Sequence, residues 1–129
     1  DYYTLISSTT NFGNDSTDNN NGQSFTSGMT GNLTSIKVVL MANDIDGFCS
    51  PGDETVLQME LQTGDGFSGS VLGTSSAITV FDGYNGLTEF IFPTSIAVVS
   101  GSMYTFEVNI LSEDCSGLNS SLDAVFNGT

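Results

Sequence analysis

The feature that most constrains this fold is a strict alternation of apolar and polar residues in short stretches. Within residues 56–62, Leu57, Met59 and Leu61 alternate with glutamine and glutamate. Residues 104–110 repeat the pattern with tyrosine, phenylalanine, valine and isoleucine. Successive side chains of a β-strand point to opposite faces of its sheet, so this period predicts antiparallel strands with one buried and one solvated face.

Glycine-containing turns separate such stretches at short intervals. The turn signals fall at residues 28, 31–32, 64–66, 82–83, 85–86 and 100–101. Further strands are predicted at residues 2–6, 24–25, 36–40, 71–73, 77–81, 89–92, 96–99 and 122–126. No window has a sustained helical period, so we expect essentially no helix.

Aromatic residues decide how many sheets these strands form. A single sheet would leave one face of the aromatic rows at residues 90–92 and 104–106 exposed, whereas two facing sheets bury both rows. The predicted fold class is all-β: an antiparallel two-sheet β-sandwich, jelly-roll-like, with one disulfide. The 129 residues suit a single domain, with an N-terminal strand or arm and a polar loop over residues 1–22 and the β-sandwich over residues 23–129.

The charge balance excludes several classes of partner. The formal net charge is -14, with Lys37 as the single cation and no histidine. Phosphate backbones and anionic membrane surfaces would repel such a chain, so we expect no nucleic-acid binding. No stretch approaches the roughly 18 apolar residues of a membrane helix, so we expect no membrane insertion. Without histidine the usual general base is missing, and short strands leave little room for a deep cleft between paired carboxylates, so we expect no enzymatic activity.

The two cysteines, Cys49 and Cys115, both lie in polar loops. They are either free thiols of a reducing compartment or the partners of a disulfide. An unpaired thiol in such a loop would be exposed and reactive, which favours the disulfide. A disulfide implies an oxidising environment, so we expect an extracellular or cell-surface location.

An acidic loop at residues 43–54 surrounds the first cysteine. Calcium takes six to eight oxygen ligands, and carboxylates beside flexible glycines can supply them. The candidate metal ligands are Asp44, Asp46, Asp53 and Glu54. Ala42 stands where an EF-hand needs its first aspartate, so only a different kind of Ca2+ site is possible. The alternative is a polar loop whose acids are merely solvated.

Two further loops carry candidate contacts for a ligand such as a glycan. Tyr84 and Phe67 are aromatic residues on predicted turns, and Asp65 and Asp82 lie beside them in the sequence. Aspartate is also common in glycine-rich turns because its side chain bonds the local backbone, so a purely structural role competes with ligand contact.

Three segments carry a family resemblance: "GQSFTSGMTGNLTSIKVVL", "LQTGDGFSGSVLGTS" and "FIFPTSIAVVSGSMYTFEV". Their order resembles a widespread extracellular bacterial β-sandwich module of the jelly-roll type, found in secreted or surface-anchored adhesin-type and carbohydrate-binding proteins. The resemblance covers about residues 22–110. It implies the fold and a location outside the cell, and it carries no catalytic motif. Cys49, Cys115 and the acidic loop fall outside its pattern.

Two functions follow as expectations. The first is a non-catalytic structural or adhesive module of a surface fibre, appendage or multidomain adhesin, whose partners are other copies of itself or neighbouring surface domains. In that case an N-terminal strand containing Tyr2, Tyr3, Leu5 and Ile6 is suited to pair with the open edge of a neighbour. The alternative is a calcium-assisted carbohydrate-binding module that uses Tyr84, Phe67 and the acidic loop at one end of the sandwich.

Overall fold

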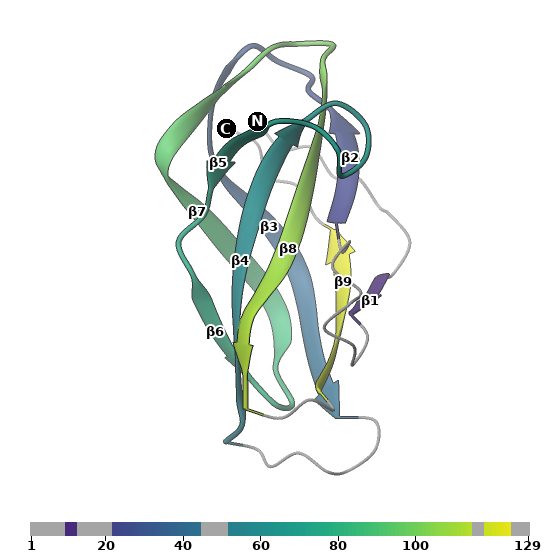
Figure 1. Cartoon of the computed structure of the whole chain (residues 1–129), viewed down its shortest axis with the longest axis vertical. Helices are drawn as coiled ribbons and strands as arrows, with labels where there is room; N and C mark the ends of the chain where they lie inside the picture. The colour runs from purple at the N-terminus through teal and green to yellow at the C-terminus, as the bar shows by residue number, and fades with distance from the viewer. Residues whose placement is uncertain (1–9, 13–21, 45–51, 115–117, 125–129) are drawn as a thin grey trace.

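The computed structural model describes residues 10–12, 22–44, 52–114 and 118–124, and only the backbone at residues 10–12, 41–44 and 118–124. The described chain is all-β and contains no helix, as predicted. Its nine strands are joined by turns and longer connections into two sheets (Figure 1). None of the described residues forms a helix long and apolar enough to cross a membrane.

Sheet A contains four strands in the order β1-β9-β3-β7. These are β1 (Thr10–Phe12), β9 (Leu118–Ala124), β3 (Gly31–Asp44) and β7 (Asn85–Val98). Sheet B has the order β2-β8-β4-β5, with β6 also paired to β4. These are β2 (Gly22–Thr26), β8 (Met103–Glu113), β4 (Glu54–Thr63), β5 (Val71–Thr74) and β6 (Ile78–Phe81). Every pairing is antiparallel.

The core lies between the two sheets, and both contribute to it. Sheet A contributes Leu33, Ile36, Val38, Leu40, Phe90, Phe92, Ile96 and Val98, and sheet B contributes Leu57, Met59, Leu61, Val80, Tyr104, Phe106 and Val108. The alternation in residues 56–62 is therefore confirmed as a buried row and a polar row. The two facing sheets bury both aromatic rows, as the sequence predicts.

Two details differ from the sequence prediction. The segments 89–92 and 96–99, predicted as separate strands, fall in the single strand β7 as far as its end at Val98, because a bulge carries the pairing past Pro93. Residues 92–95 stand opposite Thr34 alone in this bulge, the kind of place where a sheet tolerates proline. Ile110, predicted in the buried row of β8, is 37% exposed.

Two connections cross between the sheets at the end drawn lowest in Figure 1, which we call the lower end. One runs from β3 to β4 and the other from β8 to β9. The pairing of Asp44 with Leu118 joins them in sheet A. In sheet B, the Asp114 N–H donates to the Glu54 carbonyl at 2.9 Å, and the Glu54 N–H donates to Asp114 Oδ2 at 3.1 Å. Both connections therefore begin and end beside each other.

Candidate functional site

On the side of the sandwich formed by β5, β6 and β7, hydrogen bonds at residues 75–76 join the two sheets, although β7 pairs with no described strand other than β3; we call it the closed side. Ser75, between β5 and β6, donates its N–H to the Met59 carbonyl at 2.8 Å and accepts the Met59 N–H on Oγ at 2.9 Å. The next N–H, of Ser76, donates to the Ile91 carbonyl at 2.8 Å. Since Met59 lies in sheet B and Ile91 in sheet A, two consecutive residues tie the sheets together.

Side-chain packing reinforces this closure. A Cβ atom at Gly73 of β5 would lie 2.6 Å from Cδ1 of Ile96 in β7. The absence of a side chain at this glycine thus lets the two edge strands approach closely. Gln58 adds a bond from Nε2 to the Ser75 carbonyl at 3.0 Å.

The opposite side, formed by β1, β2 and the neighbouring strands β9 and β8, is only partly covered; we call it the open side. Strand β2 pairs with residues 103–107 of β8 and begins at Gly22 opposite Glu107. Beyond that point, residues 108–110, 112 and 113 of β8 pair with β4, with Leu111 in a bulge, and this segment pairs with no other strand of the described chain. Figure 1 shows the lower half of β8 without a neighbouring strand of sheet B on this side.

Apolar side chains are exposed along this uncovered half of β8. Ile110 is 37% exposed and Leu111 is 52% exposed. The partner of Ile110 in β4, Leu57, is fully buried, so exposure begins at β8 itself. Ile110 therefore departs from its predicted burial at the position where the pairing of β8 with β4 becomes irregular. A strand edge with unpaired backbone groups and exposed apolar side chains is a template for pairing with another strand.

At the upper end, the turn between β4 and β5 folds back onto the outer face of sheet B. The Gly66 N–H donates to Ser24 Oγ at 3.1 Å and to Thr105 Oγ1 at 3.0 Å, and Thr105 Oγ1 donates to the Gly64 carbonyl at 2.7 Å. Asp65, predicted as a ligand contact, accepts the Ser24 hydroxyl at 2.5 Å. Both glycines have positive φ, which only glycine adopts readily. The aspartate therefore has a structural partner in this turn.

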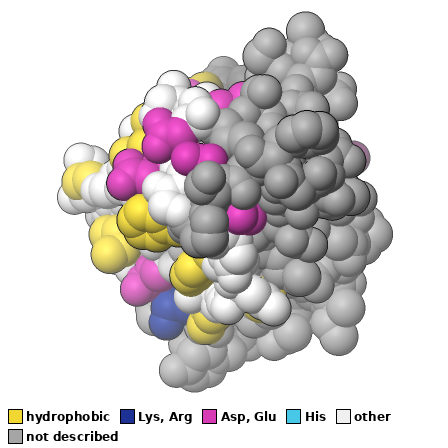
Figure 2. Space-filling view, turned by 90° about the horizontal axis from the view of Figure 1, so that it is seen from below, with side chains coloured by type: hydrophobic (Ala, Val, Ile, Leu, Met, Phe, Trp, Pro, Cys, Tyr) yellow, Lys and Arg dark blue, Asp and Glu magenta, His cyan; other side chains and the backbone are white. Residues whose placement is uncertain are grey.

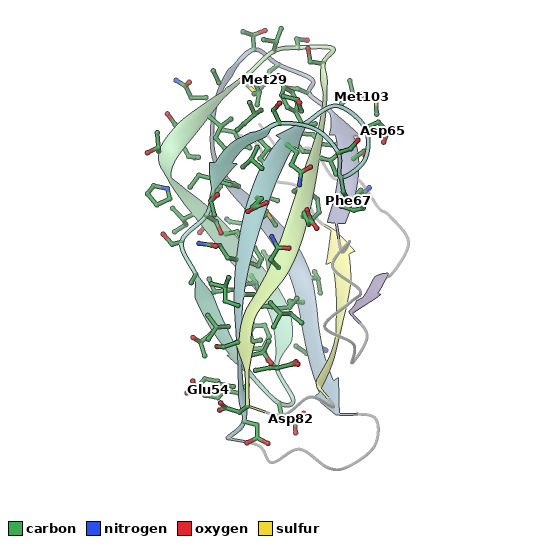
Figure 3. All side chains as sticks on the ribbon, viewed as in Figure 1. Met29, Glu54, Asp65, Phe67, Asp82 and Met103 are labelled. Atoms are coloured by element: carbon green, nitrogen blue, oxygen red, sulfur yellow. The ribbon has the colours of Figure 1, made fainter. Side chains whose placement is uncertain are left out.

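The predicted ligand-contact residues do not come together. Asp65 and Phe67 lie at the upper end, whereas Asp82 lies at the lower end with Glu54 (Figure 3). Phe67 is 36% exposed. Tyr84, two residues beyond Asp82, packs against the core and shares a hydrogen bond with Thr88 Oγ1 at 3.0 Å. The full length of β4 separates the two halves of the predicted site.

Acidic residues do gather at the lower end. Figure 2, which views the molecule from this end, shows several Asp and Glu side chains on its described part. The Asp82 N–H donates to the Asp53 carbonyl at 3.2 Å, which joins the turn after β6 to the start of β4. Within residues 22–40, 52–114 and the other described positions, no three Asp, Glu, Cys or His residues are close enough to hold a metal ion.

The remaining predicted residues lie wholly or partly outside the described chain. Of the predicted calcium ligands, Asp46 is not described and Asp44 is described only through its backbone. Cys49 and Cys115, together with Tyr2, Tyr3, Leu5 and Ile6, also fall outside the described residues. The calcium site, the disulfide and the assembly strand therefore stay predictions.

A buried polar cluster on the outer face of sheet B is not evident from the sequence. Gln62 donates from Nε2 to Glu107 Oε2 at 2.8 Å, and both side chains are buried. Glu60 stands directly opposite Glu107 on the neighbouring strand. Burial raises the pKa of Glu107, the Gln62 bond lowers it, and the charge of Glu60 raises it again, so that the pKa lies above its usual value. Only the register between β4 and β8 brings these residues together.

No protein-family model matches this chain, and no curated protein is significantly similar to it.

Proposed function

We propose that this chain is a non-catalytic structural or adhesive module that works outside the cell, as a unit of a surface fibre, appendage or multidomain adhesin. The observation that carries the proposal is the contrast between the closed side and the open side. A module built to stand alone covers both edges of its sheets, whereas a module built to join a neighbour keeps one edge available.

The order of the strands supports a jelly-roll fold, which is common in surface modules. Strands that follow each other in the chain take matching positions in the two sheets: β1 and β2, β9 and β8, β3 and β4, and β7 with the interrupted edge of β5 and β6. This winding, with two facing four-position sheets, is the arrangement expected of a jelly roll.

The geometry of the lower end supports the predicted disulfide and, with it, the extracellular location. Cys115 directly follows Asp114, whose N–H donates to the Glu54 carbonyl. Cys49 lies five residues before Glu54 in the sequence, in the connection between β3 and β4. The described residues that flank both connections lie at the same end of the molecule, which is compatible with a disulfide between Cys49 and Cys115. A disulfide there would persist only in an oxidising compartment.

The proposed function is tested in the cells that produce the protein. We expect an antibody against the chain to label intact cells, and we expect cells without the gene to lose attachment to surfaces or to one another. Labelling only after the cells are broken open, or unchanged attachment without the gene, would refute the proposal. Neither readout depends on how copies of the chain contact each other.

A calcium-assisted carbohydrate-binding module is the second candidate, favoured by the acidic residues at the lower end. Any calcium site there needs ligands beyond the described side chains, such as Asp46 or backbone carbonyls. A glycan array with calcium and with a chelator tests this function. Binding that disappears with the chelator would support it, and absence of binding in both conditions would exclude it.

A further inference from the structure

We propose that residues 2–6 of a second copy, Tyr-Tyr-Thr-Leu-Ile, add as a strand to the uncovered edge of β8 along residues 108–113. The inference rests on the proposed function and names the acceptor surface that the sequence alone does not provide. The partner is a second copy of this chain.

The acceptor edge, residues 108–113 of β8, combines backbone hydrogen-bonding groups with exposed apolar side chains. Residues 108–110, 112 and 113 pair with β4 on one side, with Leu111 in a bulge between them, so the N–H and C=O groups of this segment that do not bond β4 point toward the open side. An added strand would lie beside β8 next to the end of β2, because β2 pairs with β8 only as far as Gly22, which lies opposite Glu107. It would also cover Ile110 and Leu111. This is the geometry of β-strand addition, in which backbone bonds hold the strand and side chains select it.

The donor segment suits this edge in composition. Four of its five residues, Tyr2, Tyr3, Leu5 and Ile6, are apolar or aromatic, and the fifth, Thr4, is β-branched. Aromatic and β-branched residues are enriched in strands. Tyrosine, leucine and isoleucine side chains can pack against the exposed Ile110 and Leu111.

The direction of β1 indicates that the donor comes from a second copy. Thr10 pairs with Leu122 and Phe12 with Ser120, and Leu118 of the same strand pairs with Asp44 at the lower end. The N-terminal end of β1 therefore faces away from the lower end. The uncovered half of β8 runs toward the lower end, where Glu113 pairs with Thr55. The N-terminal end of β1 and the acceptor edge therefore point toward opposite ends of the molecule.

Residues 18–21 are the competing occupant within the same chain. They precede Gly22 and would extend β2 along the same edge if they formed a strand. Their sequence is Asp-Asn-Asn-Asn, and both residue types are depleted in strands. They offer no apolar side chain to cover Ile110 or Leu111.

The net charge of the chain predicts how salt affects its self-association. Two copies with a formal charge of -14 each repel one another, and this repulsion is screened by salt. We therefore expect self-association through this edge to tighten as the salt concentration rises. An association driven by attraction between charges would weaken instead.

The experiment uses full-length chains and analytical ultracentrifugation over a range of concentrations. The donor variant is Leu5→Pro, because proline removes a backbone donor and resists pairing in a strand. The acceptor variant is Leu111→Lys, because an exposed lysine guards a strand edge. Val99→Lys is the matched control, since Val99 is 53% exposed at the turn before β8 and carries the same charge change. A thermal melt of each variant checks that it is folded.

We expect wild type and the control variant to self-associate, and each edge variant alone to lose association at least tenfold. Mixed together, the donor and acceptor variants should form a one-to-one complex and nothing larger, because only one intact pairing is left. A milder acceptor variant, Ile110→Thr, should weaken association without placing a charge on the edge.

Three results would overturn the inference. A wild-type chain that stays monomeric at its highest soluble concentration would indicate that the edge is covered within one chain. A Leu5→Pro variant that associates like wild type would indicate pairing of two β8 edges with each other. Association that weakens with salt would contradict the repulsion argument. None of these results affects the surface-labelling and attachment readouts, so the proposed function would stand or fall separately.

Discussion

The closed side and the open side of this sandwich differ in how their strand edges are hydrogen-bonded. On the closed side, Ser75 and Ser76 bond to Met59 and Ile91 in different sheets, and Gly73 lets the edge strands approach closely. On the open side, β2 pairs with residues 103–107 of β8. Beyond them, the described chain pairs β8 with β4 alone. Exposed strand edges invite pairing with other chains, and natural proteins commonly block them. Hydrogen bonds therefore join the two sheets on the closed side, whereas on the open side the described chain leaves part of the β8 edge without a second partner strand.

The predicted disulfide would join the connection between β3 and β4 to the connection between β8 and β9. We expect reduction to lower the free energy of unfolding by about 4 kcal/mol, because the bridge would close a loop of about 66 residues in the unfolded chain. Urea unfolding with and without reductant measures this change. A Cys49→Ser, Cys115→Ser double variant should be equally unstable in both conditions. If wild type is insensitive to reductant, the bridge is absent.

Gly22→Ala tests how closely β2 approaches β8 on the open side. A Cβ atom at this position would lie 1.8 Å from the backbone oxygen of Phe106, which cannot move without disturbing β8. We expect a loss of about 3 kcal/mol in the free energy of unfolding, as for a severe overpacking substitution. The control is Gly31→Ala, whose added Cβ meets no atom within 4 Å. Equal stability of the two variants would show that β2 is loosely attached.

Ser75→Ala tests the closed side. The substitution removes the Oγ that accepts the buried Met59 N–H and leaves that donor without its partner. An unsatisfied buried donor costs about 1–3 kcal/mol, and we expect a loss of about 2 kcal/mol in chemical denaturation. Ser76→Ala should be nearly neutral, because Ser76 contributes its backbone N–H to the closure. A neutral Ser75→Ala variant would mean that the side-chain bond does not hold this side closed.

Glu107→Gln tests the polar cluster on the outer face of sheet B. The pKa of Glu107 is raised in the folded state, so its contribution stabilises the protein below the unfolded pKa and is lost as pH rises through the folded pKa. Glutamine keeps an acceptor for Gln62 Nε2, removes the charge opposite Glu60, and brings an amide that can donate to Gln62 Oε1, which has no partner among the described residues. We expect the variant to be more stable than wild type at pH 7 by about 0.2–1 kcal/mol.

The pH profile of that difference is the sharper readout. The advantage of Glu107→Gln should shrink as pH falls, because Glu107 itself becomes neutral. Glu89→Gln is the matched control, since Glu89 accepts a bond from Ser35 at 2.7 Å and stands opposite Lys37. We expect no stabilisation from that change. An advantage of Glu107→Gln that is constant with pH would rule out the raised pKa as its cause.

The sequence predicted local structure better than the arrangement of sites. The alternation of Leu57, Met59 and Leu61 marks a buried row because side-chain direction in a strand depends only on position along the chain. Ile110 is exposed beside an irregularity in the pairing of β8 with β4, and the bond between Gln62 and Glu107 depends on register between strands distant in sequence. Neither is encoded in a local pattern.

The predicted ligand site illustrates the same limit. Glu54 and Phe67 are thirteen residues apart in the sequence, and they were expected at one end of the sandwich. The ten-residue strand β4 runs between them and spans about 30 Å. Recognising residues 56–62 as one continuous strand already implies this separation, so the sequence contained a signal that the site prediction did not use.

Backbone hydrogen exchange at two protein concentrations most directly tests whether the open side is an assembly edge. We predict that those amides within residues 108–113 of β8 that do not donate to β4 exchange rapidly in dilute wild-type protein and become protected on concentration. The Leu5→Pro variant should show no such gain, and the Ser75 and Ser76 amides should be protected at every concentration. Identical exchange of residues 108–113 in dilute and concentrated wild-type protein would contradict the account.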